Sequence, residues 1–134
     1  MIRPLSLLIL MAGVLWAHHS YRAEFDPSKP TEYKATIVKL SWMNPHASMD
    51  ATIQMPNGVS ETWQFELGAP NALRQSGFTR DILKEGDTVT ITAAPAKDGS
   101  ARAHTLKVTL ADGRSFESGD RWDKMADEFA AQKQ

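Results

Sequence analysis

Two alternating segments joined by a short turn, within residues 47–67, constrain the fold more than any other part of the sequence. In "ASMDATIQM" (47–55), small or apolar residues alternate with polar ones, as a strand with one buried face requires. The turn sequence "PNG" (56–58) follows, and "SETWQFEL" (60–67) continues the alternation with Trp63, Phe65 and Leu67 on one face. This pattern predicts an antiparallel hairpin, and therefore a domain built on a β-sheet.

The rest of the chain supplies three further strands and one short helix. "YKATIVKLSWM" (33–43) is rich in β-branched and aromatic residues but too long for one flat strand, so we expect a bend near residues 39–41. "APNALRQSG" predicts a helix at about residues 70–76. Alternating segments follow within residues 82–96 and 102–110. Three strands, a helix and two strands is the element order of an OB fold, so we predict an all-β, five-stranded OB-like barrel.

Burial should follow the same alternation along each strand. The predicted core contains Met49, Ile53, Trp63, Phe65, Val89, Ile91, Leu106 and Val108. His104 is expected on the same face of its strand as Leu106 and Val108, as a partly buried histidine at the strand end.

The first 17 residues have the three-part layout of a signal peptide. One positive charge, Arg3, precedes an apolar run of about eleven residues, and the small residue Ala17 offers a cleavage site. The run is shorter than the roughly 20 residues that cross a bilayer. We therefore expect an exported bacterial protein, periplasmic or secreted, without a stable membrane anchor after cleavage and with residues 18–32 as an N-terminal arm.

The barrel is expected to occupy residues 33–114 of this 134-residue chain, which has room for one domain. Residues 115–134 are expected to form a C-terminal amphipathic helix, since apolar residues recur there at helical spacing: Trp122, Met125, Ala126 and Phe129. Such a helix covers the barrel or, alternatively, binds a partner. With no cysteine in the sequence, disulfides cannot contribute to stability, which must come from packing.

Charge and motifs exclude several classes of function. Without Arg3, 14 of the 15 basic residues remain against 16 acidic ones, a net charge of −2 that offers no surface for nucleic acid. The sequence has no cysteine nucleophile, no nucleophile-elbow serine and no glycine-rich phosphate loop. These absences favour a binding module over an enzyme.

Several motifs resemble one family of small exported bacterial proteins. They are "AHHS", "EFDPSKP", "WMNPH", "WQFELGAPNALRQSGFT", "LKEGDTVTITAAPAKDGSARAH" and "LADGR", in that order between residues 17 and 114. The family, DUF6152, is of unknown function, so the resemblance implies no activity. Two features depart from the family pattern: His104, which stands where a small polar residue is expected, and the C-terminal helix.

The "AHHS" motif raises the possibility of a metal site. Cleavage after Ala17 gives His18 a free α-amine, and this amine and its own imidazole together chelate a metal ion. A third nitrogen completes a histidine brace, which suits copper because copper heads the affinity order of divalent ions for nitrogen ligands. His46, in "NPH", is the candidate third ligand, and His19 can substitute for His18 or orient it. His104 is a less secure candidate.

Alternatives to a copper site remain open. His18 and His19 can instead form a solvated end with no metal, and His46 a hydrogen-bonded turn residue. A metal-free barrel would bind a small ligand or a protein through Trp42 and Asn44, although core packing is the simpler role for Trp42. A histidine-brace copper oxidoreductase is a weaker alternative, because it shares its metal ligands with a copper-binding module.

Overall fold

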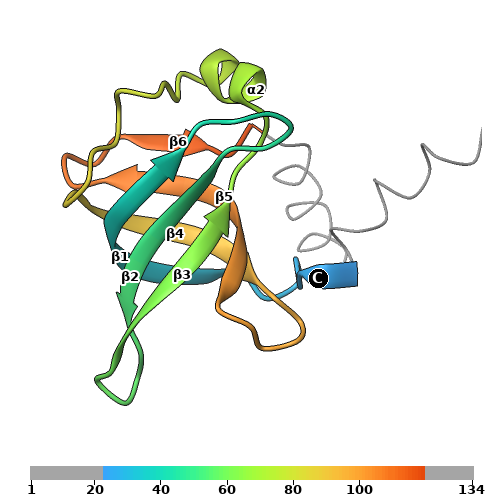
Figure 1. Ribbon diagram of the computed structural model, residues 1–134, viewed down its shortest axis with the longest axis vertical. Coiled ribbons are helices and arrows are strands. Elements are labelled where there is room, and N and C mark those ends of the chain that lie inside the picture. The colour runs from blue at the N-terminus through green and yellow to red at the C-terminus, as the bar shows by residue number, and fades with distance from the viewer. Residues whose placement is uncertain (1–22, 120–134) are drawn as a thin grey trace, which may run out of the picture.

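The computed structural model describes residues 23–119, which form six strands and one short helix (Figure 1). The elements are β1 (Thr31–Ser41), β2 (Ser48–Gln54), β3 (Ser60–Glu66), α2 (Pro70–Gln75), β4 (Thr88–Pro95), β5 (Arg102–Leu110) and β6 (Ser115–Glu117). Within this part of the chain, no helix is long and apolar enough to cross a membrane.

The five long strands close into a barrel. They are ordered β3-β2-β1-β4-β5, every neighbouring pair in that order is antiparallel, and β3 also pairs with β5 in parallel. The closing register joins Phe65 to Ala103 and Glu66 to His104. This is the strand order of an OB fold, and α2 follows β3 as predicted, so the OB-like barrel is confirmed.

The barrel interior follows the alternation of the sequence. Seven of the eight residues predicted as core are buried: Met49, Ile53, Phe65, Val89, Ile91, Leu106 and Val108. Trp63 is the exception, since it is only half-buried at the edge of the core. Its indole Nε1–H donates a hydrogen bond to Glu61 Oε2 (2.8 Å), and a polar partner of this kind keeps one end of a tryptophan at the surface.

Strand β1 differs in detail from its predicted form. It begins at Thr31, so the arm predicted for residues 18–32 ends earlier than expected. The register between β1 and β2 shifts between Ile37 and Lys39, which leaves Val38 as the extra residue of a β-bulge. This bulge bends the strand just before the position predicted for the bend.

A second bulge, in β5, changes the position of His104. Thr92 pairs with Lys107 while Ala93 pairs with Thr105, so Leu106 is an extra residue in β5. Thr105 lies opposite the core residue Ala93 and faces the barrel interior, and His104 therefore points to the outer face. The prediction that His104 shares a face with Val108 is wrong, because the bulge reverses the alternation between them.

The C-terminal boundary also needs correction. Residues 115–117 form strand β6, which pairs with β5, where the sequence predicted the beginning of a helix. After Ser118, the chain passes close to α2: a Cβ atom on Gly119 would lie 2.8 Å from the carbonyl carbon of Ala72. The predicted helical residues Trp122, Met125, Ala126 and Phe129 lie outside the described residues, as do the predicted signal peptide, His18 and His19.

Candidate functional site

His104 is buried on the outer face of the barrel beneath the N-terminal segment. The histidine is 1% exposed, and its ring centroid lies 5.9 Å from that of Phe25, which is also 1% exposed. The backbone of the segment is fixed to the end of β4 by two hydrogen bonds, Asp26 N–H to the Pro95 carbonyl (3.0 Å) and Lys97 N–H to the Glu24 carbonyl (2.7 Å). Figure 1 shows the blue segment beside the orange β4–β5 hairpin.

Arg102 connects this segment to two strands of the barrel. Its guanidinium donates to Glu66 Oε1 (2.8 Å) on β3 and to Glu24 Oε2 (3.3 Å) on the N-terminal segment. The central carbon of this guanidinium, Arg102 Cζ, lies 5.5 Å from the centre of the Phe25 ring. Phe25 therefore contacts both His104 and Arg102, and we call Glu24, Phe25, Glu66, Arg102 and His104 the Phe25 clamp.

His46 approaches the clamp from the connection between β1 and β2. Ala47, the next residue, donates its N–H to the Gly68 carbonyl (3.0 Å) and accepts from Leu67 N–H (2.9 Å). These bonds extend the β2–β3 pairing by one residue and bring exposed His46 beside Gly68, which carries no side chain. Because Glu66 pairs with His104 across the barrel closure, His46 lies near His104 on the outer face.

The two histidines interact electrostatically. Burial, with a smaller contribution from the nearby His46 ring, lowers the pKa of His104 to about 4. His104 is therefore a neutral imidazole at neutral pH, with a ring nitrogen lone pair of the kind that binds metal ions.

The lowered pKa predicts how stability depends on pH. The unfolded chain takes up the His104 proton near pH 6.5 and the folded protein only near pH 4, so stability falls as pH decreases through this window. The full effect is about 3 kcal/mol. Urea unfolding of metal-free protein between pH 7 and 4 should show this loss, and His104→Gln should remove the part of it that comes from His104. Equal pH profiles for the two proteins would contradict the assignment.

The described residues do not complete a metal site. Within residues 23–119, no group of three histidine, cysteine, aspartate or glutamate side chains is placed to hold a metal ion. Of the four predicted metal ligands, the structure brings His46 and His104 together. The other two, His18 and His19, lie outside the described residues, and any further nitrogen ligand from histidine would have to come from them.

The predicted ligand-binding residues Trp42 and Asn44 lie on the same connection as His46. The Trp42 ring stacks on Phe78 (centroids 6.2 Å apart, planes at 11°), and the Arg74 guanidinium carbon lies 5.8 Å from its centre. These contacts favour the packing role for Trp42, since its ring already has partners in the protein. Asn44 is exposed and precedes the cis peptide bond to Pro45.

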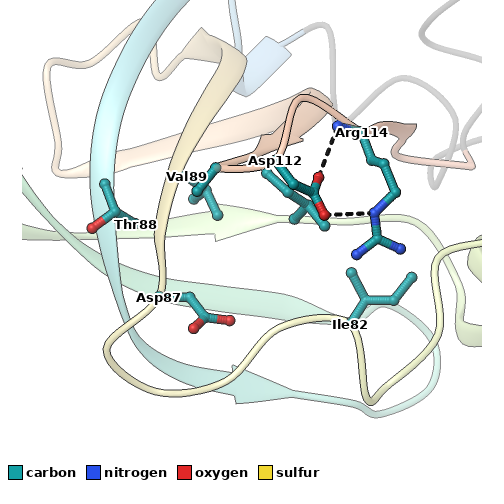
Figure 2. Close-up of a pocket in the computed structure, with 8 residues that line it drawn as sticks. Ile82, Asp87, Thr88, Val89, Asp112 and Arg114 are labelled. Carbon is teal, nitrogen blue, oxygen red and sulfur yellow. Dashed lines mark hydrogen bonds and ion pairs between the residues drawn. The ribbon is translucent and has the colours of Figure 1, made fainter.

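Of two pockets on the described surface, one lies away from the Phe25 clamp and the other beside it. One, of about 250 Å³, is lined by Ile82, Asp87, Thr88, Val89, Leu110, Ala111, Asp112 and Arg114, and Figure 2 shows Asp87 across it from the Asp112–Arg114 pair. Its volume is below the roughly 300 Å³ of small-molecule sites. The other, of about 370 Å³, opens beside the Phe25 clamp where the described chain begins, and is lined by Ala23, Glu24, Ala96, Lys97, Asp98 and Arg102.

Comparison with known families identifies the chain. The model of a family described as "Family of unknown function (DUF6152)" matches residues 7–105. The chain belongs to this family. No curated protein and no solved structure matches the DUF6152 chain.

Sequence reasoning did not identify four residues of the Phe25 clamp: Glu24, Phe25, Glu66 and Arg102. Glu24 and Phe25 appear above only within "EFDPSKP", and Glu66 only within "SETWQFEL" and "WQFELGAPNALRQSGFT". The available signal was the isolated aromatic residue in the polar arm, because a phenylalanine there needs an apolar surface to cover it.

Proposed function

We propose that this DUF6152 protein is an exported binding module that binds copper through the mature N-terminus and two histidines of the barrel. His18 would supply its α-amine and imidazole, His46 and His104 the remaining nitrogens, and His19 a substitute or orienting group. Amine and imidazole nitrogens suit Cu(II), which heads the affinity order for divalent ions at such ligands.

The observation that carries this proposal is the position of Phe25. Its side chain covers His104, which interacts with His46, and Phe25 lies seven positions after His18. Seven residues span at most about 25 Å when fully extended. The chain is therefore long enough for His18 to reach the two barrel histidines from this anchor.

The state of His104 also supports metal binding. A metal ion competes with protons for imidazole nitrogen, so a ligand that remains neutral binds metal over a wider range of pH. With a pKa of about 4, His104 is a neutral imidazole throughout the neutral range. Both ring nitrogens of His104 are buried, so a metal ion would reach them only after a shift of the segment that carries Phe25.

Export is the second part of the proposal and rests on residues 1–17. The apolar run ends at Ala17, and cleavage there would create the α-amine that the site requires. Mass spectrometry of the protein recovered from outside the cytoplasm should therefore give His18 as its first residue.

The site is tested by Cu(II) titration of this mature protein and two variants of the same loop. His46→Ala should weaken binding by at least the roughly tenfold that loss of an outer-shell partner causes, because it removes a metal ligand. Asn44→Ala is the matched control, since Asn44 is also exposed, and it should leave Cu(II) affinity unchanged. Equal affinities for the mature protein and His46→Ala would exclude His46 as a ligand.

A metal-free interaction barrel is the second candidate, favoured by the exposure of Met43. This side chain is 63% exposed between Trp42 and Asn44, where a protein or apolar ligand can contact it. Under this alternative, the mature protein would bind no copper.

A further inference from the structure

We infer that Asn57, in the turn between β2 and β3, is a site of spontaneous deamidation in which the backbone nitrogen of Gly58 attacks the Asn57 carboxamide. The aspartate that results keeps the hydrogen bonds of the turn. This turn projects from the barrel (Figure 1), and neither step involves the proposed copper site.

The reaction needs only these two residues and water. The Gly58 nitrogen forms a bond to Asn57 Cγ and gives up its proton, and the Cγ–Nδ2 bond breaks, so that ammonia leaves and a cyclic succinimide remains. Water then adds to one of the two ring carbonyls and opens the ring. Opening at Cγ gives aspartate, whereas opening at the main-chain carbonyl carbon gives isoaspartate, in which the backbone runs through the side chain.

The turn holds the Asn57 carboxamide beside the Gly58 peptide. Asn57 Oδ1 accepts a hydrogen bond from Val59 N–H (3.0 Å), so the carboxamide lies alongside the peptide unit between them. A donor at this oxygen draws electrons from Cγ and favours attack by a nucleophile. Packing does not shield the site, because all three residues are exposed and a Cβ atom on Gly58 would meet no atom beyond its chain neighbours within 4 Å.

One hydrogen bond opposes the reaction. Gly58 N–H donates to the Met55 carbonyl (2.8 Å), and this bond must open before the nitrogen can attack. The net contribution of one backbone hydrogen bond is small, so its loss at an exposed turn slows the reaction by no more than about tenfold. Such a turn also opens locally without unfolding the strands that it joins. The folded protein should therefore deamidate nearly as fast as the unfolded chain.

Two other hairpin turns show that aspartate fits this geometry. Asp98, between β4 and β5, and Asp112, between β5 and β6, each precede a glycine with positive φ, as Asn57 does. Their carboxylates accept hydrogen bonds from the N–H groups two residues later, of Ser100 (2.9 Å) and Arg114 (3.0 Å). Conversion of Asn57 to aspartate thus adds a negative charge and keeps this arrangement. Isoaspartate adds a carbon atom to the backbone and disrupts it.

The other two asparagines of the chain serve as internal controls. Asn44 precedes Pro45, whose nitrogen carries no hydrogen and cannot form the succinimide. Asn71 lies in α2, where its Oδ1 accepts a hydrogen bond from Arg74 Nη1 (2.9 Å) and the Cβ of Ala72 crowds the attacking nitrogen. Both should keep their amides in the folded protein.

The test is peptide mapping by mass spectrometry of the purified protein, incubated at mildly alkaline pH both folded and in guanidinium chloride. We expect the mass gain of an amide converted to an acid at Asn57, and not at Asn44 or Asn71, in the folded protein. The folded rate should lie within about tenfold of the unfolded rate. A folded rate lower by more than about tenfold, or no gain at Asn57, would overturn the inference.

Two variants of Asn57 complete the test. Asn57→Ser has no carboxamide and should show no mass gain in this peptide, whereas a gain that persists would come from another residue, such as Gln54, and would overturn the assignment. Asn57→Asp supplies the aspartate product directly and should unfold at the same urea concentration as the unmodified protein. A lower midpoint would show that the carboxylate does not fit the turn, against the second part of the inference.

Discussion

Replacing Phe65 with alanine should lower the free energy of unfolding by about 3 to 5 kcal/mol. Phe65 is fully buried, and its ring centroid lies 5.4 Å from that of Tyr33 and 6.4 Å from that of Trp63. Its backbone pairs with Met49 on β2 and with Ala103 on β5, at the line where the barrel closes. A cavity here would remove packing from both sides of that closure.

Such a loss is large for a domain whose total stability is about 5 to 15 kcal/mol. Val59→Ala is the matched control, because it also shortens an apolar side chain but at a position 54% exposed, in the β2–β3 turn. It should change stability by no more than about 0.5 kcal/mol. Urea unfolding followed by circular dichroism measures both. A cost for Phe65→Ala as small as that for Val59→Ala would show that Phe65 does not belong to the core.

The barrel could be predicted from the sequence because its strands have one buried face each. Met49 and Ile53 alternate with polar residues, and the turn at residues 56–58 limits how the hairpin pairs. The order of strands and helix along the chain is then compatible with few folds, and the OB-like barrel is one of them. The same local rule failed for Trp63, whose hydrogen bond to Glu61 holds the indole partly at the surface.

Features that depend on pairing between strands could not be predicted. The extra residue Leu106 is recognised only when β5 is aligned with β4, and it moves His104 from the predicted interior face to the outer face. Strand β6 has three residues, too few for a periodic pattern to show. It forms because the turn after Leu110 returns the chain alongside β5.

The candidate site was predictable only in part, because it also depends on which strands pair with one another. The sequence indicated His46 and, less securely, His104, because histidine is the commonest metal ligand in proteins. It gave no indication that Arg102 bonds Glu24, 78 residues earlier in the chain, or that Phe25 covers His104. These contacts exist only after barrel closure brings β3, β5 and the N-terminal segment together.

The other large effect we expect comes from the α-amine of His18. In the proposed mature protein this amine and the His18 imidazole would chelate one metal ion, and a single extra residue in front would convert the amine to an amide nitrogen without changing any side chain. Loss of a metal ligand should weaken Cu(II) binding more than loss of an outer-shell partner, which weakens it about 10- to 100-fold. Binding should also weaken as pH falls, since protons compete for an amine whose unperturbed pKa is about 7.7 to 8.0 and for the His18 imidazole, whose unperturbed pKa is near 6.5.

The most direct test is therefore a Cu(II) titration, at one neutral pH, of protein that begins at His18 and of the same protein with one alanine added before it. The two differ only at the N-terminus, and both keep His18, His19, His46 and His104. We predict that the protein beginning at His18 binds Cu(II) more than about 100-fold tighter, a difference of more than about 2.7 kcal/mol. Equal affinities would contradict the copper site proposed here.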